Sequence, residues 1–266
     1  MNYNAKEGTI NFDGYDMDYL VFGKGTLPLV IVQGLNLTGL PGGYKIQPIR
    51  YELYAKNFRV YMVDRRRPLP ESITVEDIAK DVADGLRILG VDNAYVIGNS
   101  QGGMIAQYLA INYPKLVKKL VLNVTTCEVD PVLEKNVKAW VEEAKETGDL
   151  DSISVKFTDL LYPPDKVPKV SKSMARLYAM QKRRPPEDFI KLAEACLTVD
   201  TYDRLGEIKC PVRVMGGRKD MIISPESSLK LAEALGTEPI LFDDLGHAAY
   251  ETPEYQKKVL EFLLED

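Results

Sequence analysis

A short pattern of glycines around a serine constrains the fold of this chain more than any other feature. Gly98-Asn99-Ser100-Gln101-Gly102 follows the apolar run Ala94-Tyr95-Val96-Ile97 and precedes an amphipathic run that starts at Met104. This context predicts a strand that turns sharply into a helix, with Ser100 at the turn. Side chains next to so sharp a bend would collide, which explains the glycines at positions 98 and 102. The pattern therefore predicts a serine hydroxyl held clear of a sheet.

The chain also contains the acid and the base that could activate such a serine. Its single histidine, His247, follows the apolar run 240–242, and Asp220 lies just past the predicted buried strand 212–216. The resulting order is serine, aspartate, histidine. Asp243 and Asp244 are closer to His247 in sequence, but they lie too near the same strand end to reach its far nitrogen. Asp220 is therefore the predicted acid.

Short apolar runs alternate with helical patterns, which predicts a mostly parallel sheet with helices on both faces. The predicted strands are 29–32, 58–63, 94–97, 120–122, 212–216 and 239–242, after a hairpin of strands 9–12 and 16–22. Helices are predicted at 74–89, 225–235 and 253–264, and also at 132–146, 153–161, 170–181 and 187–197. The last four form a cap at 127–206, inserted into a core of 1–126 and 207–266.

Composition excludes several other classes. A net charge of −5 over 266 residues disfavours nucleic acid as a partner, because phosphate binding needs a basic surface. No apolar stretch reaches the roughly 20 residues that span a bilayer, and neither terminus resembles a signal peptide. One histidine and three scattered cysteines argue against a metal site. We expect a cytoplasmic protein without a membrane or metal partner, and monomer and homodimer both stay open.

Together these motifs resemble the α/β-hydrolase superfamily along nearly the whole chain. The serine turn follows the fifth predicted strand, the cap the sixth, the acid the seventh and the histidine the eighth. Residues 200–212 are also similar to the segment by which esterase-like members return from cap to core. The resemblance implies an α/β fold with a mostly parallel eight-stranded sheet. It further implies a catalytic triad in which Ser100 is the nucleophile, His247 the base and Asp220 the residue that orients it.

The same resemblance places an oxyanion hole at the backbone N–H groups of Leu35 and Gln101. The chain departs from the family where Gln33-Gly34 replaces a frequent His-Gly pair and where Arg65 to Pro70 replaces a glycine-rich loop. We expect the oxyanion hole to survive the first change and the substrate class to depend on the second. The runs Arg65-Arg66-Arg67 and Lys182-Arg183-Arg184 are interpreted as solvated faces, with anion binding as the alternative.

We therefore expect a serine hydrolase that cleaves a small to medium carboxylic ester or thioester, without a cofactor. Hydrolysis of a C–C bond, lactone opening and perhydrolase chemistry are alternatives that use the same triad, and a non-catalytic ligand-binding protein is the alternative of another class. The residues expected to contact the acyl substrate are Gln33, Gly34, Met104, Trp140, Leu161, Tyr178 and Ala248.

Overall fold

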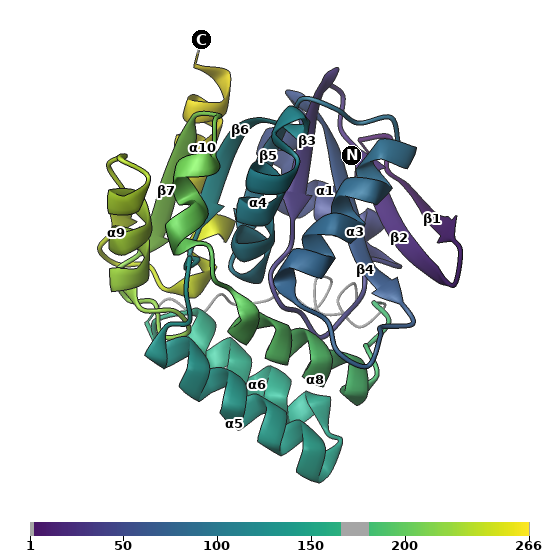
Figure 1. Cartoon of the computed structure of the whole chain (residues 1–266), viewed down its shortest axis with the longest axis vertical. Coiled ribbons are helices and arrows are strands. Elements are labelled where there is room, and N and C mark those ends of the chain that lie inside the picture. Colours follow the sequence, from purple (N-terminus) through teal and green to yellow (C-terminus); the bar gives the residue numbers. More distant parts are fainter. Residues whose placement is uncertain (1–2, 166–180, 266) are drawn as a thin grey trace.

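The computed structural model describes residues 3–165 and 181–265, and an eight-stranded sheet runs through them (Figure 1). The strands follow the spatial order β1-β2-β4-β3-β5-β6-β7-β8. They are β1 (Lys6–Phe12), β2 (Tyr15–Phe22), β3 (Leu27–Val32), β4 (Phe58–Arg67), β5 (Ala94–Asn99), β6 (Val117–Asn123), β7 (Val212–Gly217) and β8 (Ile240–Phe242). β1 and β2 pair antiparallel at one edge, and all pairings from β4 to β8 are parallel. The predicted α/β fold is confirmed.

Helices cover both faces of this sheet, because its central strands are apolar on both sides. Every residue of β5 is buried. One face packs against α3 (Val75–Ile88), α4 (Gln101–Asn112) and α9 (Pro225–Ala234). The other packs against α2 (Glu52–Ala55) and α10 (Pro253–Leu264), and the short α1 (Gln47–Arg50) contacts α2. Single turns of 3₁₀ helix lie at 43–45, 114–116 and 196–198, and longer ones at 202–207 and 247–251.

Local sequence explains where the helices begin and end. Thr74 caps α3, accepting from Asp77 N while the Asp77 carboxylate accepts from Thr74 N, so the first turn satisfies its own backbone donors. Asp130 accepts from two backbone N–H groups at the start of α5 (Pro131–Thr147). Gly148 ends α5 in the left-handed conformation at φ 64°, which glycine adopts without strain.

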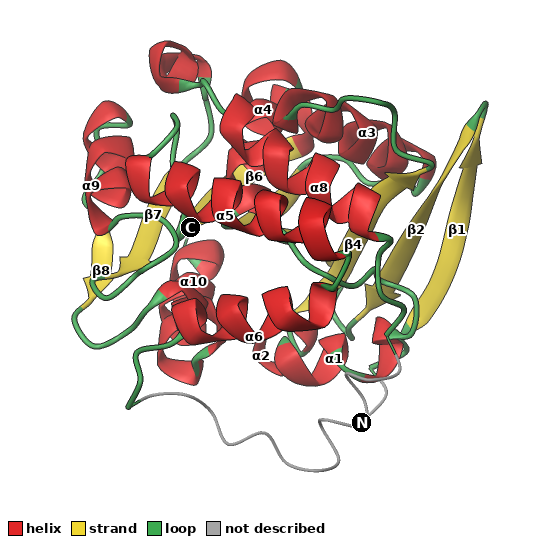
Figure 2. Cartoon of the chain, turned by 90° about the horizontal axis from the view of Figure 1, so that it is seen from below, coloured by secondary structure: helices red, strands yellow, loops and turns green. Residues whose placement is uncertain are grey.

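A helical segment, called the insertion below, connects β6 to β7. Its described α-helices are α5, α6 (Leu150–Leu161) and α8 (Pro186–Ala195), which lie below the sheet in Figure 1 and in front of it in Figure 2. The helix predicted at 170–181 falls almost entirely outside the described residues. No helix in the described ranges combines the length and apolar character needed to cross a membrane.

The structure corrects the interpretation of the first basic run. β4 continues to Arg67, and Arg66 and Arg67 pair with Met17 and Asp16 of β2, so this run is part of the sheet and not a loop. Arg66 forms an ion pair with buried Asp81. Arg65 is buried and Arg66 half-buried, so the predicted solvated face is wrong for these two residues, whereas Arg67 is exposed.

Candidate active site

Ser100 lies at the sharp turn between β5 and α4. Its backbone has φ 55° and ψ −124°, a combination that a residue with a side chain adopts only when its surroundings enforce it. Ser100 N donates to Asn123 O at 2.9 Å, and Ser100 O accepts from Thr125 Oγ1 at 2.8 Å. These bonds fix the turn and leave the hydroxyl outside the backbone network.

The two flanking glycines are required by close backbone approach. A Cβ on Gly98 would lie 2.6 Å from Gly102 O, and one on Gly102 would lie 2.0 Å from Val32 O. Both distances are far below any real carbon–oxygen contact, so no other residue fits without moving the backbone. The turn can therefore pack against the end of β3 only with glycine at these positions.

Asp220 and His247 form a buried pair on loops beyond β7 and β8. His247 Nδ1 lies 2.7 Å from Asp220 Oδ2, and both side chains are at most 3% exposed. The other carboxylate oxygen, Asp220 Oδ1, accepts from Ile222 N at 2.9 Å and Ile223 N at 3.1 Å. With Nδ1 hydrogen-bonded to the carboxylate, the second ring nitrogen is left to act as a base.

The two competing aspartates point elsewhere. Asp243 pairs with Arg218 at 2.8 Å and Asp244 with Lys219 at 3.0 Å, and both carboxylates are largely exposed. Charge on either residue is screened by solvent and by its own partner. Of the three candidate acids, the structure places Asp220 against the imidazole.

A cavity of about 880 Å³ brings Ser100 and His247 together. Its described lining comes from the loop after β3, from α1, from α6 of the insertion and from the loop that carries His247. Within the described part of the chain, no hydrogen bond joins Ser100 Oγ to His247, although both line this cavity. Such bonds are often long in ligand-free enzymes and shorten when substrate binds.

Two backbone donors next to the cavity are unused. Leu35 lines it, and Gln101 follows Ser100 as the first residue of α4. Within the described residues, neither Leu35 N nor Gln101 N donates to a protein acceptor. The first N–H groups of a helix have no partner inside the helix and attract negative charge. Both donors are thus available to an anionic oxygen near Ser100.

A buried arginine connects the two segments that carry these donors. Arg65 Nη2 donates to Gln33 O at 2.8 Å and to Gln101 Oε1 at 2.9 Å. The Gln101 amide in turn donates to Leu192 O at 2.6 Å, in α8 of the insertion. Burial, with the nearby charge of Arg184, lowers the pKa of Arg65 to about 10, so it stays cationic at neutral pH.

A second buried arginine anchors the segment that precedes α8 of the insertion. Arg184 Nη2 lies 2.5 Å from Asp64 Oδ1, with both side chains at most 6% exposed. Burial favours the neutral acid, but Arg184 and the N–H groups of Leu40 and Arg65 outweigh it and hold the Asp64 pKa below its usual value. The predicted solvated face is therefore wrong for Arg184, because its charge is needed to pair a buried carboxylate.

The predicted substrate contacts divide into three groups. Gln33, Gly34 and Leu161 line the cavity. Met104, Trp140 and Ala248 are not among the described lining residues, a correction to the expected set. Met104 is fully buried in the core, Ala248 is 2% exposed, and the Trp140 ring packs at 4.9 Å on Phe157, which itself reaches the cavity. Tyr178 lies outside the described residues.

Several polar lining residues escaped the sequence interpretation. They include Asn36, Gln47, Arg50, Tyr250 and Glu251. Tyr250 and Glu251 follow His247 closely, so proximity to the histidine could have indicated them. Burial raises the pKa of Tyr250 well above its usual value, which keeps its hydroxyl protonated. The short α1 helix that carries Gln47 and Arg50 gave no local signal.

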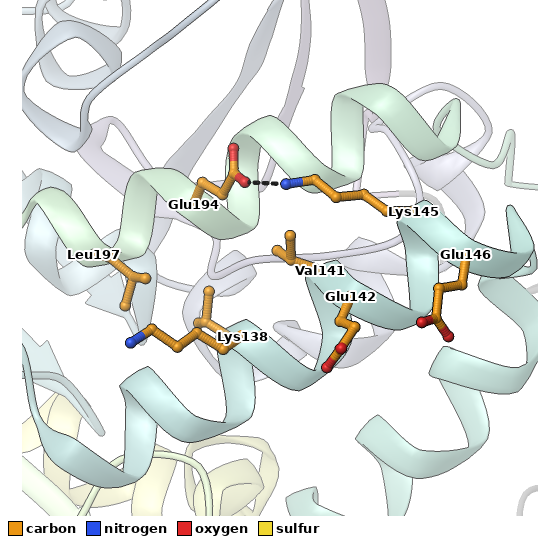
Figure 3. A pocket seen from close by; sticks show the side chains of 8 residues that line it. Lys138, Val141, Glu142, Lys145, Glu146, Glu194 and Leu197 are labelled. Atoms are coloured by element: carbon orange, nitrogen blue, oxygen red, sulfur yellow. Dashed lines mark hydrogen bonds and ion pairs between the residues drawn. The ribbon is translucent and has the colours of Figure 1, made fainter.

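A second hollow lies between α5 and α8, and its described lining does not include Ser100 (Figure 3). Lys145 and Glu194 form a 2.8 Å ion pair across it, and exposed charged side chains make up most of its rim. None of the predicted site residues lines it. Among the described residues, no cluster of histidine, cysteine, aspartate and glutamate has the arrangement of a metal site.

Comparison with known proteins agrees with this geometry. The model of the alpha/beta hydrolase fold family matches residues 28–254. A Rhizobium rhizogenes protein named "Putative carbamate hydrolase RutD" is 27% identical over 237 residues, covering 85% of this chain and 90% of that protein. A Caulobacter protein of the same name is 28% identical over 208 residues, covering 74% of this chain and 76% of its own length.

Solved structures share the whole architecture. The enol-lactonase from Burkholderia xenovorans superposes with a TM-score of 0.81 at 20% identity, covering 97% of this chain and 100% of that one. A thermophilic esterase from Thermogutta terrifontis gives 0.78 at 22% identity, with coverages of 97% and 98%. At these identities the likeness concerns the fold. Since the family model spans most of the sheet and reaches past His247, this chain belongs to the alpha/beta hydrolase family.

Proposed function

We propose that this hydrolase uses Ser100 as a nucleophile to cleave a small to medium carboxylic ester or thioester. The observation that carries the proposal is the convergence on one cavity of a strained serine and a buried histidine–aspartate pair. A histidine oriented by a carboxylate and facing the same cavity as a serine fits acyl transfer. A histidine that served only to pack the core would not need to line this cavity.

In the proposed reaction, Ser100 Oγ attacks the acyl carbonyl carbon while His247 Nε2 accepts the hydroxyl proton. The tetrahedral intermediate collapses to an acyl-enzyme, and the imidazolium returns the proton to the departing alcohol or thiol. Water then attacks the acyl-enzyme by the same route and releases the acid. The Asp220 carboxylate stabilises the imidazolium that forms in each half-reaction.

The anionic oxygen of the intermediate is assigned to Leu35 N and Gln101 N. Their lack of protein acceptors in the described residues supports the assignment, because a preorganised donor loses nothing when the oxyanion forms. A cavity of about 880 Å³ also lies in the range of small-molecule sites, which agrees with a small to medium substrate.

Carbamate hydrolysis is a second candidate function. The relatives named "Putative carbamate hydrolase RutD" and the polar lining of the cavity favour it. A carbamate carries an amino group next to the carbonyl and needs hydrogen-bond acceptors nearby. The same serine, histidine and oxyanion donors would serve either substrate, so the two candidates differ in what surrounds the acyl group.

Labelling with a fluorophosphonate probe tests the proposal directly. The wild-type protein should be labelled at Ser100, as located by peptide mass spectrometry, and Ser100→Ala and His247→Ala should stay unlabelled. Ser228→Ala is a matched control, since Ser228 is also buried but lies outside the described lining of the cavity. It should label like the wild type.

Turnover then separates the two candidates. Acetate and butanoate esters of 4-nitrophenol should give a burst of nitrophenol and an acyl-enzyme detectable by mass. Faster turnover of an unsubstituted carbamate ester would favour the second candidate. A wild-type protein that neither labels nor turns over any of these compounds is a ligand-binding protein on this fold.

A further inference from the structure

Gln47 carries a buried hydrogen-bond acceptor without a partner. The residue begins α1 and is 2% exposed, yet its Oε1 accepts no hydrogen bond. Gln47 lines the same cavity as Ser100 and His247. Because buried side-chain oxygens in folded proteins are nearly always paired, this one needs an explanation.

Gln107 shows how this protein normally treats a buried glutamine. Gln107 Nε2 donates to Gly103 O at 3.1 Å and to Thr126 O at 2.9 Å, and its Oε1 accepts from Thr201 Oγ1 at 2.6 Å. That amide ties α4 to the helical insertion. Gln47 makes no comparable bond with either amide atom within the described residues, so structural anchoring does not account for it.

The charges around Gln47 favour an uncharged partner. Among the described lining residues, the side chains of aspartate, glutamate, lysine and arginine form two ion pairs. Arg50 lies 3.1 Å from Glu251, and Arg183 lies 2.5 Å from Asp151. Each cation is matched by an anion, so a charged ligand group would have to displace a partner. A neutral donor meets no such cost.

The backbone next to Gln47 keeps its amide close to the cavity. A Cβ on Gly43 would lie 3.4 Å from Gln47 Cγ and 3.6 Å from Gln181 Nε2. These are ordinary van der Waals distances, so both glutamine side chains lie next to the 3₁₀ turn at 43–45. Gln181 lines the cavity as well, and the two amides form a polar wall beside it.

We propose that Gln47 Oε1 accepts a hydrogen bond from a neutral O–H or N–H group of the substrate, so that the site selects hydroxyl- or amino-bearing acyl compounds over purely apolar ones. This assignment rests on the proposed hydrolase function, since it concerns the same cavity. Carbamates belong to the selected class through their N–H group, and so do esters of hydroxy acids.

Three pairs of esters of equal size test the assignment. In each pair one member has a hydroxyl where the other has a methyl group: 4-nitrophenyl hydroxyacetate and propanoate, 4-nitrophenyl 3-hydroxypropanoate and butanoate, and 2-hydroxyethyl and propyl acetate. The first two pairs place the donor on the acyl side, and the third places it on the alcohol side. The ratio of kcat/KM within a pair, corrected for uncatalysed hydrolysis, cancels general effects on the enzyme.

In at least one pair, the preference for the hydroxylated ester, measured as the ratio of kcat/KM, should be about tenfold larger in the wild type than in Gln47→Leu. This is the factor expected for one uncharged hydrogen bond. Only the ratio within a pair is compared, so a general change in the rate of the variant does not affect the test. The variant should still be labelled by a fluorophosphonate and melt no lower than the wild type, because leucine removes an unpaired polar atom. Gln107→Leu is the matched control, with an unchanged ratio and a lower melting temperature.

The outcomes are distinct. Equal ratios in wild type and Gln47→Leu, with normal labelling by the probe, overturn the role of Gln47 and leave the hydrolase function standing. A melting temperature lowered as in Gln107→Leu overturns the premise that this amide is unpaired. A wild type that neither labels nor turns over any ester overturns the proposed function and this inference together.

Discussion

Two buried aspartates, Asp64 within β4 and Asp220 beyond the end of β7, have similar surroundings and different partners. Asp220 accepts from two backbone N–H groups and pairs with His247, while Asp64 accepts from two backbone N–H groups and pairs with Arg184. His247 lines the cavity, and imidazole is the side chain that most often accepts and donates protons in enzymes. Arg184 is not among the described lining residues, and a guanidinium group does not give up its proton in proteins. A carboxylate in such a setting supports proton transfer only where its partner can gain and lose a proton.

The difference extends to what each pair connects. Asp220 and His247 lie on loops that follow neighbouring strands of the core, β7 and β8. Asp64 and Arg184 join the core to the segment that precedes α8 of the insertion, where Arg184 N also donates to Leu37 O at 3.0 Å. We therefore expect the first pair to control rate and the second to control stability.

The largest effect should come from breaking the first pair. Asp220→Asn should lower kcat about 10⁴-fold, because an asparagine leaves the imidazole in the wrong tautomer and its cation unsupported. Steady-state assays with a 4-nitrophenyl ester measure the loss in kcat. Asp243→Asn is the control, since that carboxylate is exposed and paired with Arg218. Retention of a tenth of the wild-type kcat in Asp220→Asn would contradict the assignment.

Breaking the second pair should unfold the protein more readily. Arg184→Met leaves the Asp64 carboxylate buried without its cation, which costs about 3–5 kcal/mol in the free energy of unfolding. Equilibrium unfolding in urea measures this loss. Lys80→Met removes an exposed partner of Asp84 and should cost less than about 1 kcal/mol. Similar losses in the two variants would show that the Asp64 pair is energetically an ordinary surface pair.

The contrast also explains which features could be predicted from the sequence. Apolar runs located the strands, and chain order indicated Ser100, Asp220 and His247 as one set, because the carboxyl ends of parallel strands meet at one edge of a sheet. These signals are local or follow from strand order. The sheet and its connectivity were predicted for that reason.

The buried arginines of the basic runs were misinterpreted because their partners are distant in sequence. Arg184 pairs with a residue 120 positions away, and Arg65 bonds to Gln101 across 36 positions. A run of arginines reads as a solvated face when such pairings are unknown. Gln47 was missed for the same reason. Its importance rests on an acceptor without a partner, and a sequence pattern does not show which side chains lack partners.

Arg65, like Arg184, is a buried arginine, but it contacts the two segments that carry the proposed oxyanion-hole donors. Arg65→Met should lower kcat about tenfold with little change in KM, because Gln33 O and Gln101 Oε1 lose the donor that fixes them relative to each other. Steady-state kinetics measure both constants. Arg65→Lys retains a charge and a donor and should recover part of the rate. A loss confined to stability, with kcat unchanged in folded Arg65→Met, would make this arginine purely structural.

The smallest predicted effect is the pH dependence of stability that the Asp64 pair produces, which further distinguishes Asp64 from Asp220. In the wild type the Asp64 pKa is held below its unfolded value of about 3.9. Its contribution to stability is therefore complete above that pH and declines as pH falls through the lower, folded pKa. Without Arg184, burial dominates and raises the folded pKa of Asp64 above the unfolded one. The variant then carries a penalty at neutral pH that protonation relieves.

The stability difference between wild type and Arg184→Met should accordingly narrow as pH falls from 7 to 5, by about 1 kcal/mol for each unit of raised pKa that the titration passes through. Urea unfolding of both proteins at several pH values measures this difference. Asp64→Asn combined with Arg184→Met removes the titrating group, so its difference from the wild type should stay constant over the same range. If the free energies of unfolding of the single and double variants change in the same way with pH, protonation of Asp64 does not relieve the penalty. The stability lost in Arg184→Met then arises from packing rather than from an unpaired buried charge.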